Sequence, residues 1–334
     1  MIQELDLNNN GDELKKSIDK FPGAKVLVIG DIIMDEYIWG DVSRISPEAP
    51  VPVVQVKQET KILGGAANVI NNINSLGGQS SLCGVIGDDQ TGQEILKKIK
   101  DLGLTTDGIV IETDRHTSNK TRIVAHNQQV VRFDRETQKG IKNDSIESLL
   151  SFIEKTMDSL DAIVVEDYGK GVISAQLMKG LRKLTLESGI ILAVDPKTDH
   201  FEYYQGIDVI TPNQYEAGGF CGIEIKDEES LIQTGRQMLE RLNCRSVLIT
   251  RGKDGMTLFE RRREIYHIPT VARKIFDVSG AGDTVISTLC LGLASGLDLK
   301  SAAIIANFAA GIVVGEVGTS VVKADELKKA INSR

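Results

Sequence analysis

Short runs of aliphatic and β-branched residues recur along the chain, and segments with a helical spacing of apolar residues separate them. The apolar runs span residues 25–31, 162–167, 190–195, 208–213 and 245–250, and the helical segments span 144–160, 174–188 and 228–242. Strands that alternate with helices need crossover connections, which are right-handed and place helices on both faces of a mostly parallel sheet. The sequence therefore predicts an α/β fold of this class.

Two stretches interrupt this alternation. Residues 36–60 are rich in Pro and Val, and residues 117–135 contain two short alternating runs around His126. Both stretches are typical of strands without intervening helices, as in an antiparallel flap. We expect them to form a small inserted β-sheet that acts as a lid. The chain of 334 residues then divides into an N-terminal extension at 1–24 and one large domain at 25–334.

Charge, cysteine spacing and the length of apolar runs limit the possible partners of the protein and its cellular compartment. The formal net charge of −8 argues against nucleic acid or an anionic membrane as a partner. The four cysteines are scattered without a C-x-x-C pair, which favours reduced thiols over zinc ligands or a disulfide scaffold. No apolar run has the length of a signal peptide or a membrane span, so we expect a cytoplasmic protein.

Polar residues end each of the predicted strands. They include Asp31, Glu166, Asp195, Asn213 and Thr250. Ligands bind to open α/β sheets at the carboxyl ends of the strands. This repetition predicts a ligand site at that edge of the sheet.

The octet at residues 277–284, D-V-S-G-A-G-D-T, precedes an apolar run and indicates the start of a helix. Its two glycines permit a tight turn at a helix N-terminus, where unpaired N–H groups and the helix dipole attract anions. Asp283 lies in the first helical turn, beside such an anion. A base next to preorganised donors is what phosphoryl transfer to a hydroxyl requires. The alternative is a helix that is merely capped.

The octet resembles the C-terminal signature of the ribokinase-like (PfkB) family of carbohydrate and nucleoside kinases, with Val278 in place of the usual Thr. The resemblance implies that Asp283 is the catalytic base and that Gly280, Ala281 and Gly282 form the anion hole. Residues 64–69 are similar to the sugar-binding glycine motif of the family. The substrate-binding residues that this implies are Asp31, Asp35, Gly64, Gly65 and Asn68.

Further segments resemble the nucleotide-binding parts of the family. The motif N-x-x-E at 213–216 implies roles for Asn213, Gln214, Tyr215 and Glu216 near ATP, with Asn213 and Glu216 holding Mg²⁺ largely through water. The loop at 250–255 implies contacts from Thr250, Gly252 and Gly255, and Asn307 corresponds to a position near adenine. Without the resemblance, the pattern at 213–216 predicts only a helix N-terminus, and the pattern at 250–255 predicts only a hairpin turn. The chain has no P-loop motif, so the turn at Gly280 remains the predicted phosphate site.

A narrower resemblance concerns the substrate. Residues 40–54, D-Y-G-K-G at 167–171 and D-P-K at 195–197 look like the D-glycero-β-D-manno-heptose 7-phosphate kinases of the ADP-heptose pathway, although Glu166 replaces a usual Ser. The implied reaction is phosphorylation at O1, with Lys170, Lys197 and an arginine such as Arg132 holding the 7-phosphate. The alternatives are another sugar or nucleoside kinase of this family and a non-catalytic sugar or nucleotide sensor.

The resemblance also bears on cations and partners. Asp277 and carbonyl groups at residues 315–320 are candidates for a monovalent cation such as K⁺, as in some relatives. An exposed lid sheet implies a homodimer formed through the lid. The H-x-G-H motif of a nucleotidyltransferase domain is absent from the sequence, so we expect adenylyl transfer to be carried by another protein.

Overall fold

The computed structural model describes residues 2–5, 7, 11–126, 128–261, 264–272, 275–316 and 320–332. Its main sheet is ten-stranded, in the order β1-β14-β13-β12-β11-β10-β9-β2-β5-β6. The strands are β1 (Ile2–Glu4), β2 (Lys25–Gly30), β5 (Gln79–Gly87), β6 (Ile109–Glu112), β9 (Ala162–Glu166), β10 (Ile191–Asp195), β11 (Val209–Ile210), β12 (Ser246–Thr250), β13 (Met256–Glu260) and β14 (Ile265–Ile268). Only β13 pairs antiparallel with its two neighbours, so the predicted mostly parallel sheet is confirmed for the described residues.

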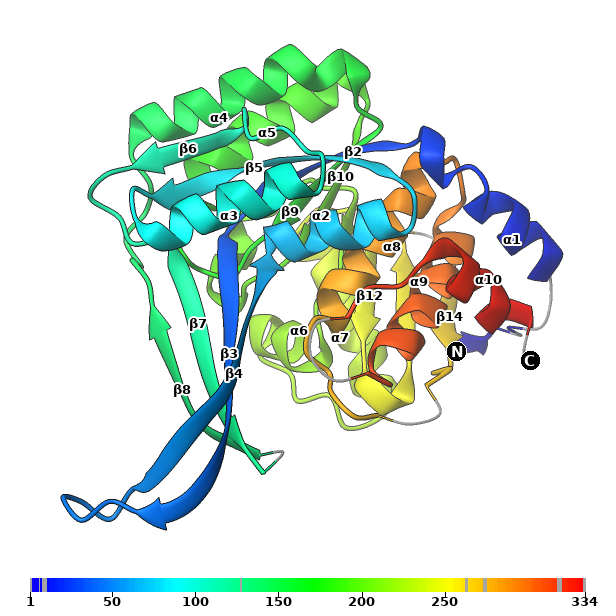
Figure 1. Cartoon of the computed structure of the whole chain (residues 1–334). Helices are drawn as coiled ribbons and strands as arrows, with labels where there is room; N and C mark the ends of the chain where they lie inside the picture. The colour runs from blue at the N-terminus through cyan, green and yellow to red at the C-terminus, as the bar shows by residue number, and fades with distance from the viewer. Residues whose placement is uncertain are drawn as a thin grey trace.

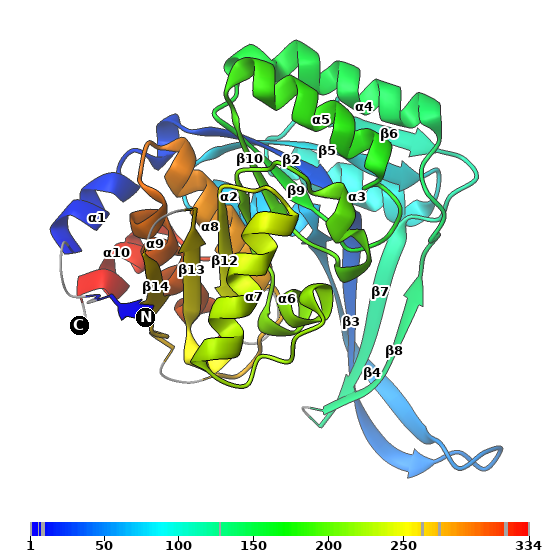
Figure 2. The ribbon, with the colours of Figure 1, turned by 180° about the vertical axis from the view of Figure 1, so that it is seen from behind.

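Helices cover both faces of this sheet (Figures 1 and 2). They are α1 (Gly11–Ile18), α2 (Ala66–Ser75), α3 (Gln90–Asp101), α4 (Asn143–Thr156), α5 (Ala175–Ser188), α6 (Gln214–Cys221), α7 (Glu228–Arg241), α8 (Ala281–Ala294), α9 (Leu299–Val313) and α10 (Ala324–Asn332). Alternate residues of one strand enter two different cores, because successive side chains of a strand point to opposite faces. Val164 packs in the core under α2, α8 and α9, whereas Val165 packs in the core under α4, α5 and α7.

A second sheet of four strands projects from the main body, in the order β4-β3-β7-β8 (Figure 1). Its strands are β3 (Ile32–Ile45), β4 (Pro52–Gly65), β7 (Ser118–Ala125) and β8 (Gln128–Arg135). Each hairpin is antiparallel, as expected for a flap, and the two hairpins join through a parallel pairing of β3 with β7. The predicted small β-sheet is therefore confirmed as part of the fold. Asp31 alone separates β2 from β3, so it marks the point where the chain leaves the main sheet.

Most predicted elements agree with the structure to within a few residues. The run at 208–213 is the largest difference, because only Val209–Ile210 pairs as a strand before the chain turns into α6. Residues set apart as an N-terminal extension add an edge strand: β1 pairs in parallel with β14, and α1 packs close to α10. Within the described ranges, no helix is both long enough and apolar enough to cross a membrane.

Candidate active site

Asp283 lies in the first turn of α8 and is 3% exposed. Gly280, the residue before the helix, has a left-handed backbone (φ 77°) and provides no side-chain cap. The N–H groups of the first turn therefore receive no partner from a capping side chain. Asn68 Nδ2 donates to one carboxylate oxygen of Asp283 at 2.6 Å, and the Tyr168 hydroxyl donates to the other at 2.8 Å. Burial raises the pKa of Asp283, and these two hydrogen bonds oppose that shift.

Asn68 reaches Asp283 because α2 begins at a glycine pair. Gly65 has φ 56°, and a Cβ at that position would overlap the carbonyl oxygen of Asp31. A Cβ at Gly64 would overlap the carboxylate of Asp35, so the glycine lets this acid approach the start of α2. The Asn68 side chain donates to the predicted base, and its contact with a sugar hydroxyl remains a prediction.

Four of the eight predicted nucleotide residues line a cavity beside the helix start, whereas Asn213, Gln214, Tyr215 and Glu216 do not line it. A cavity of about 140 Å³ is lined by Thr250, Gly252, Gly255, Asn307 and Gly282, among other residues. Much of its remaining lining is apolar, as suits the flat face of a base. Asn307 Nδ2 donates to the Pro269 carbonyl at 2.8 Å, so part of its amide is already used within the protein. The cavity and the Gly280 turn form one continuous region through Gly282.

The segment at 213–216 forms a helix cap. Asn213 Oδ1 accepts hydrogen bonds from the backbone N–H groups of Tyr215 and Glu216, at 2.9 and 3.0 Å, and Glu216 Oε2 accepts from the N–H of Asn213 at 2.8 Å. This reciprocal pattern is a capping box, which matches the alternative reading of a helix N-terminus. Tyr215 is 81% exposed. One oxygen of Glu216 remains outside the cap, which is compatible with holding a cation through water.

Asp31 has a structural task at this site. It is 1% exposed, and its carboxylate accepts backbone N–H groups from Tyr168, Lys170 and Val172 at 2.9, 2.9 and 3.1 Å. These bonds hold the loop after β9 against the end of β2. Three of the roughly four acceptor sites of this carboxylate are used within the protein, and a direct contact from Asp31 to a sugar hydroxyl remains a prediction.

Basic residues from the lid and the loop after β9 surround the same region. Arg122 is paired with Asp35, and Lys120 Nζ lies 4.4 Å from the ring centre of Tyr168. Burial lowers the pKa of Lys120. Lys170 pairs with Glu136 at 2.6 Å.

The other two predicted clamp residues are less enclosed. Arg132 Nε and Nη2 both bind the carboxylate of Asp134 at 3.0 Å, and its side chain is 49% exposed. Lys197 is exposed, and its aliphatic stem lies beside Gly169. The structure therefore encloses Lys120, Arg122 and Lys170 more deeply than Arg132 and Lys197.

Three carboxylates meet at the carboxyl ends of β9 and β10. Glu166, Asp195 and Asp283 each offer one oxygen, and these atoms lie within 4.8 Å of one another. The Thr211 hydroxyl donates to Asp195 at 2.7 Å. Burial raises the pKa of Asp195 to about 8, and burial together with nearby Asp195 holds the pKa of Glu166 well above its ordinary value. This arrangement places three acids beside the Gly280 turn, and the raised pKa values favour the protonated forms of Glu166 and Asp195 near neutral pH.

Comparison with known proteins identifies the family of the chain. The profile of the pfkB family carbohydrate kinases matches residues 24–325. The chain belongs to this family. The predicted class of enzyme, a phosphotransferase that acts on a sugar hydroxyl, is thereby confirmed. Membership also implies a nucleotide donor and a divalent cation.

Relatives from bacteria resemble the chain over most of its length. A protein named "Bifunctional protein HldE" from Desulfatibacillum aliphaticivorans is 45% identical over 317 residues, which cover 95% of this chain and 65% of that protein. A protein of the same name from Geobacter sulfurreducens is 43% identical over 301 residues, or 90% of this chain and 61% of the relative. The pfkB chain described here thus spans less than two thirds of the length of these relatives.

Solved structures share the pfkB fold at low sequence identity. Arabidopsis thaliana ribokinase, complexed with ribose and ATP, superimposes with a TM-score of 0.74 at 17% identity, over 93% of this chain and 99% of that chain. Escherichia coli phosphofructokinase-2, in complex with potassium, gives a TM-score of 0.76 at 16% identity, over 92% and 98%. The predicted ribokinase-like fold is confirmed.

The sequence motifs assign no individual role to Tyr168, Glu166 or Asp195, although Glu166 and Asp195 are among the polar strand ends and Tyr168 and Asp195 lie in the D-Y-G-K-G and D-P-K motifs. Their position is the sequence feature that points to the site, because each of them lies at the end of a predicted strand or directly after it. Their distances to Asp283 depend on the packing of α8 across the strand ends, which no local pattern encodes.

The predicted monovalent-cation site is only partly described. Asp277 accepts a hydrogen bond from the Ser279 N–H at 2.9 Å, and residues 317–319 lie outside the described residues.

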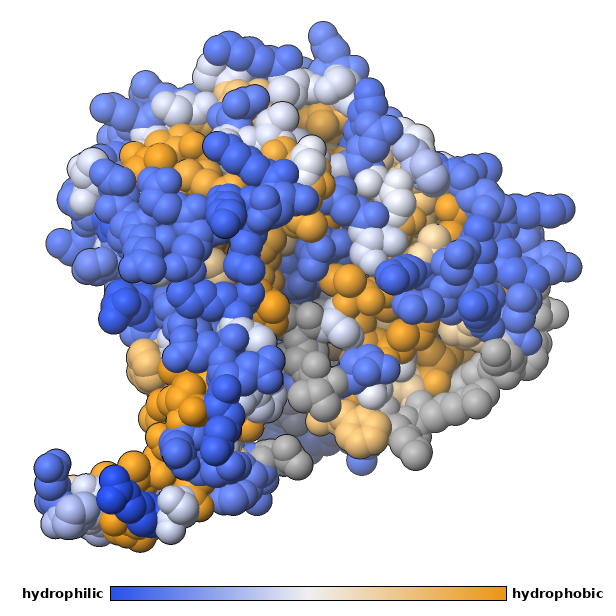
Figure 3. Space-filling view, in the orientation of Figure 1, coloured by the Kyte–Doolittle hydropathy of each residue, from blue (hydrophilic) through white to orange (hydrophobic). Residues whose placement is uncertain are grey.

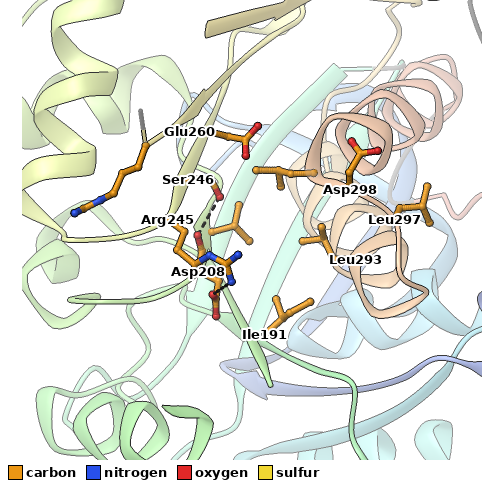
Figure 4. Close-up of a pocket in the computed structure, with 11 residues that line it drawn as sticks. Ile191, Asp208, Arg245, Ser246, Glu260, Leu293, Leu297 and Asp298 are labelled. Atoms are coloured by element: carbon orange, nitrogen blue, oxygen red, sulfur yellow. Dashed lines mark hydrogen bonds and ion pairs between the residues drawn. The ribbon is translucent and has the colours of Figure 1, made fainter. Parts of the chain in front are cut away.

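A second cavity, of about 470 Å³, lies at the opposite end of the sheet (Figure 4). It is lined by Ile191 and Ser246, which begin β10 and β12, and by Asp208, Arg245 and Asp298. Arg245 Nη1 binds Asp208 at 3.0 Å, so the facing charges neutralise each other. Parallel sheets bind ligands at the other edge, and none of the predicted site residues lines this cavity.

Proposed function

We propose that the chain transfers the γ-phosphoryl group of ATP to O1 of D-glycero-β-D-manno-heptose 7-phosphate and forms the 1,7-bisphosphate. The observation that carries this proposal is the position of Asp283. Its carboxylate lies one turn into α8, beside the Gly280 turn, and also adjoins side chains from α2 and the loop after β9. A proton acceptor and an anion cradle therefore adjoin each other. The proposal of the heptose substrate draws on the lid and loop motifs and on the named relatives.

In the proposed reaction, the anomeric hydroxyl attacks the γ-phosphorus while the bond to the β–γ bridging oxygen breaks. The proton of that hydroxyl passes to a carboxylate oxygen of Asp283, and ADP leaves. The N–H groups at residues 280–282 stabilise charge on the transferred group. Mg²⁺, when bound, offsets charge on the phosphate oxygens. Phosphoryl transfer passes through a loose transition state, so Asp283 does not need to be strongly basic.

The basic residues near Tyr168 support an anionic acceptor. In an acidic protein, Lys120, Arg122 and Lys170 gather around Tyr168 and Asp35. A sugar phosphate would gain charge-assisted hydrogen bonds there. The pairing of Lys170 with Glu136 means that a phosphate competes with this carboxylate for the lysine. Arg132 and Lys197 remain candidate contacts at the outer edge.

A panel of acceptors tests the substrate. We expect ADP release with heptose 7-phosphate to exceed release with ribose or fructose 6-phosphate in kcat/KM, and phosphorus NMR to show a new anomeric phosphate. Preference for another acceptor would favour the alternative of a different pfkB sugar or nucleoside kinase. Binding without turnover of any acceptor would favour a sugar or nucleotide sensor.

Lys170→Ala tests the phosphate clamp within the same assay. We expect a higher KM for the sugar phosphate and an unchanged KM for ATP, because Lys170 lies on the acceptor side. An equal rise in both KM values would assign Lys170 a structural role. Lys179→Ala, on helix α5 away from the site, is the control.

A homodimer through the lid is the proposed assembly. Apolar side chains gather along the projecting sheet (Figure 3). The exposed ones include Val130, Val131 and Phe133 on β8. Exposed apolar surface on a sheet of this kind favours burial against another copy. Light scattering of the wild type and of Val131→Lys tests it, and a monomeric wild type at micromolar concentration would contradict it.

A further inference from the structure

The Tyr168 side chain joins the predicted base to the lid. Its hydroxyl donates to a carboxylate oxygen of Asp283 at 2.8 Å, and Lys120 Nζ lies 4.4 Å from the centre of its ring. Lys120 belongs to β7, so the ring contacts the lid sheet while the hydroxyl contacts the base. A cation over an aromatic face also stabilises the ring in its position. A tyrosine placed in this way can influence how the base meets an acceptor hydroxyl.

The loop that carries Tyr168 is fixed by two buried charged groups. The Asp31 carboxylate accepts the backbone N–H groups of Tyr168, Lys170 and Val172, and Arg115 Nη1 donates to the Lys170 carbonyl at 2.9 Å. Asp31 is 1% exposed and Arg115 is 6% exposed. Hydrogen bonds in which one partner is charged are stronger than neutral ones. The protein's own groups therefore hold the backbone of Tyr168 in place.

The Asp283 carboxylate has a donor on each of its oxygens. Asn68 Nδ2 donates to one oxygen at 2.6 Å, and the Tyr168 hydroxyl donates to the other at 2.8 Å. Each carboxylate oxygen can accept two hydrogen bonds, so the proton of an acceptor hydroxyl still finds an acceptor site on Asp283. The torsion that rotates a carboxylate is soft, and donors on both oxygens restrict this rotation. The remaining acceptor sites thus point in defined directions.

The Tyr168 hydroxyl is a donor and not a second base. Burial and the nearby charge of Asp283 raise the pKa of Tyr168 well above its ordinary value, so the phenol stays protonated. Burial raises the pKa of Asp283, and the hydrogen bond from Tyr168 opposes this shift, as does the one from Asn68. The hydroxyl therefore favours the ionised form of Asp283, which is the form that accepts a proton.

We propose that Tyr168 is a positioning residue for phosphoryl transfer: its hydroxyl fixes the Asp283 carboxylate so that a remaining acceptor site faces the incoming hydroxyl. The proton of that hydroxyl passes to Asp283, and Tyr168 keeps its own proton throughout. The inference rests on the proposed function only in the role of Asp283 as the base, and not in the identity of the sugar. The rival explanations are that Tyr168 only packs in the site, or that its hydroxyl binds the sugar.

Tyr168→Phe removes the hydroxyl and keeps the ring, so it tests this role in the full chain. With ATP and the acceptor of highest kcat/KM in the panel, we expect kcat on the pH plateau to fall about tenfold, with little change in either KM. We also expect the acid limb of the kcat profile to move to higher pH, because Asp283 loses a hydrogen bond that lowers its pKa.

Tyr266→Phe is the matched control. The Tyr266 hydroxyl also donates to a carboxylate, that of Glu264, at 3.2 Å, and Lys300 Nζ lies 4.0 Å from its ring centre. Tyr266 belongs to β14, near the far edge of the main sheet from β9, so we expect wild-type kinetics in this variant. Thermal unfolding of both variants checks that they are folded.

Carbon-13 NMR of the aspartate carboxyl groups gives a second readout, without ATP or acceptor. Asp283→Asn assigns the Asp283 signal by its loss. We expect the titration midpoint of this signal to lie at higher pH in Tyr168→Phe than in the wild type. Because this readout does not need turnover, failure of the proposed kinase reaction can be told apart from failure of the inference.

Three results would overturn the proposal. Unchanged kcat with an unmoved Asp283 midpoint would leave Tyr168 with a packing role. A higher KM for the acceptor at normal kcat would assign the hydroxyl to sugar binding. Recovery of full kcat above the shifted acid limb would show that the hydroxyl changes the protonation of Asp283 without orienting it.

Discussion

The two ends of the main sheet treat charge in opposite ways. At the amino ends of β10 and β12, Asp208 is neutralised by Arg245, and the Ser246 hydroxyl donates to the Asp208 carbonyl at 3.0 Å (Figure 4). At the carboxyl ends, Glu166 is buried and Asp195 is partly buried, and among the described residues neither forms an ion pair with a basic side chain. The 470 Å³ cavity is therefore a poor guide to function, whereas the acids with raised pKa values mark the end of the sheet where the predicted site residues gather.

The start of α8 adds to this difference. Its N–H groups are directed to the carboxyl end of the sheet, and they attract anions next to three acids. The opposite cavity includes Asp298, which already caps α9 by accepting the Ser301 N–H at 3.0 Å. The first N–H groups of α8 thus have no side-chain cap and can bind a ligand, whereas at the start of α9 the Asp298 side chain accepts one of these N–H groups.

Loss of the carboxylate at the helix start should have the largest effect. We expect Asp283→Asn to lower kcat by ~10²–10⁴, the usual loss for a general base, with little change in fold. Asp298→Asn at the other end is the control, because Asn caps a helix as well as Asp does. Steady-state ADP release measures both, and near-normal turnover in Asp283→Asn would refute its role as the base.

A methyl group in the cradle should have the next largest effect. Gly282→Ala introduces only an ordinary contact of 3.6 Å with Asp195, so we expect a folded protein. The methyl group would occupy space next to the phosphate, and we expect a loss in kcat of roughly 10², similar to the loss of one oxyanion-hole donor. Gly219→Ala in α6 also gives a 3.6 Å contact, with Thr198, and should keep full activity. Equal rates in the two variants would remove the cradle from the mechanism.

The partner of the base should matter less than the base itself. Asn68 lowers the pKa of Asp283, so Asn68→Ala should raise that pKa further. Activity needs the ionised carboxylate, so the acid limb of the kcat/KM profile should move to higher pH, with a loss of about tenfold in rate. Asn74→Ala in the same helix is the control. An unmoved acid limb would show that this hydrogen bond does not tune the base.

The amino end of the sheet should show the smallest effect. The Arg245 side chain is 81% exposed, and ion pairs of this kind contribute about 0–1 kcal/mol. We expect Arg245→Ala to change the free energy of unfolding within that range and to leave kcat unchanged. Urea unfolding and ADP release measure these two quantities. A tenfold loss of turnover would mean that the second cavity takes part in the reaction.

Local patterns predicted the elements well where burial was continuous. The run at 162–167 and the helix at 174–188 correspond to β9 and α5, because apolar spacing reflects burial on one or two faces. The run at 208–213 contributes only Val209–Ile210, since Asn213 and Glu216 form a capping box immediately afterwards. Residues 2–4 carry too weak a pattern to predict a strand, and their pairing with β14 is a long-range contact.

The sequence by itself determined the α/β class, the polar ends of the strands and the glycine turn before Asp283, because these depend on spacing and backbone freedom within short segments. Only the tertiary structure decided what surrounds that acid. Asn68 is 215 residues away along the chain and Tyr168 is 115 residues away, yet both bond to it. The tertiary structure likewise decided that Asp31 accepts hydrogen bonds from the loop after β9 and that Glu166 is a buried acid. Hydrogen bonding and desolvation act across space, and sequence position does not specify which distant groups share one buried volume.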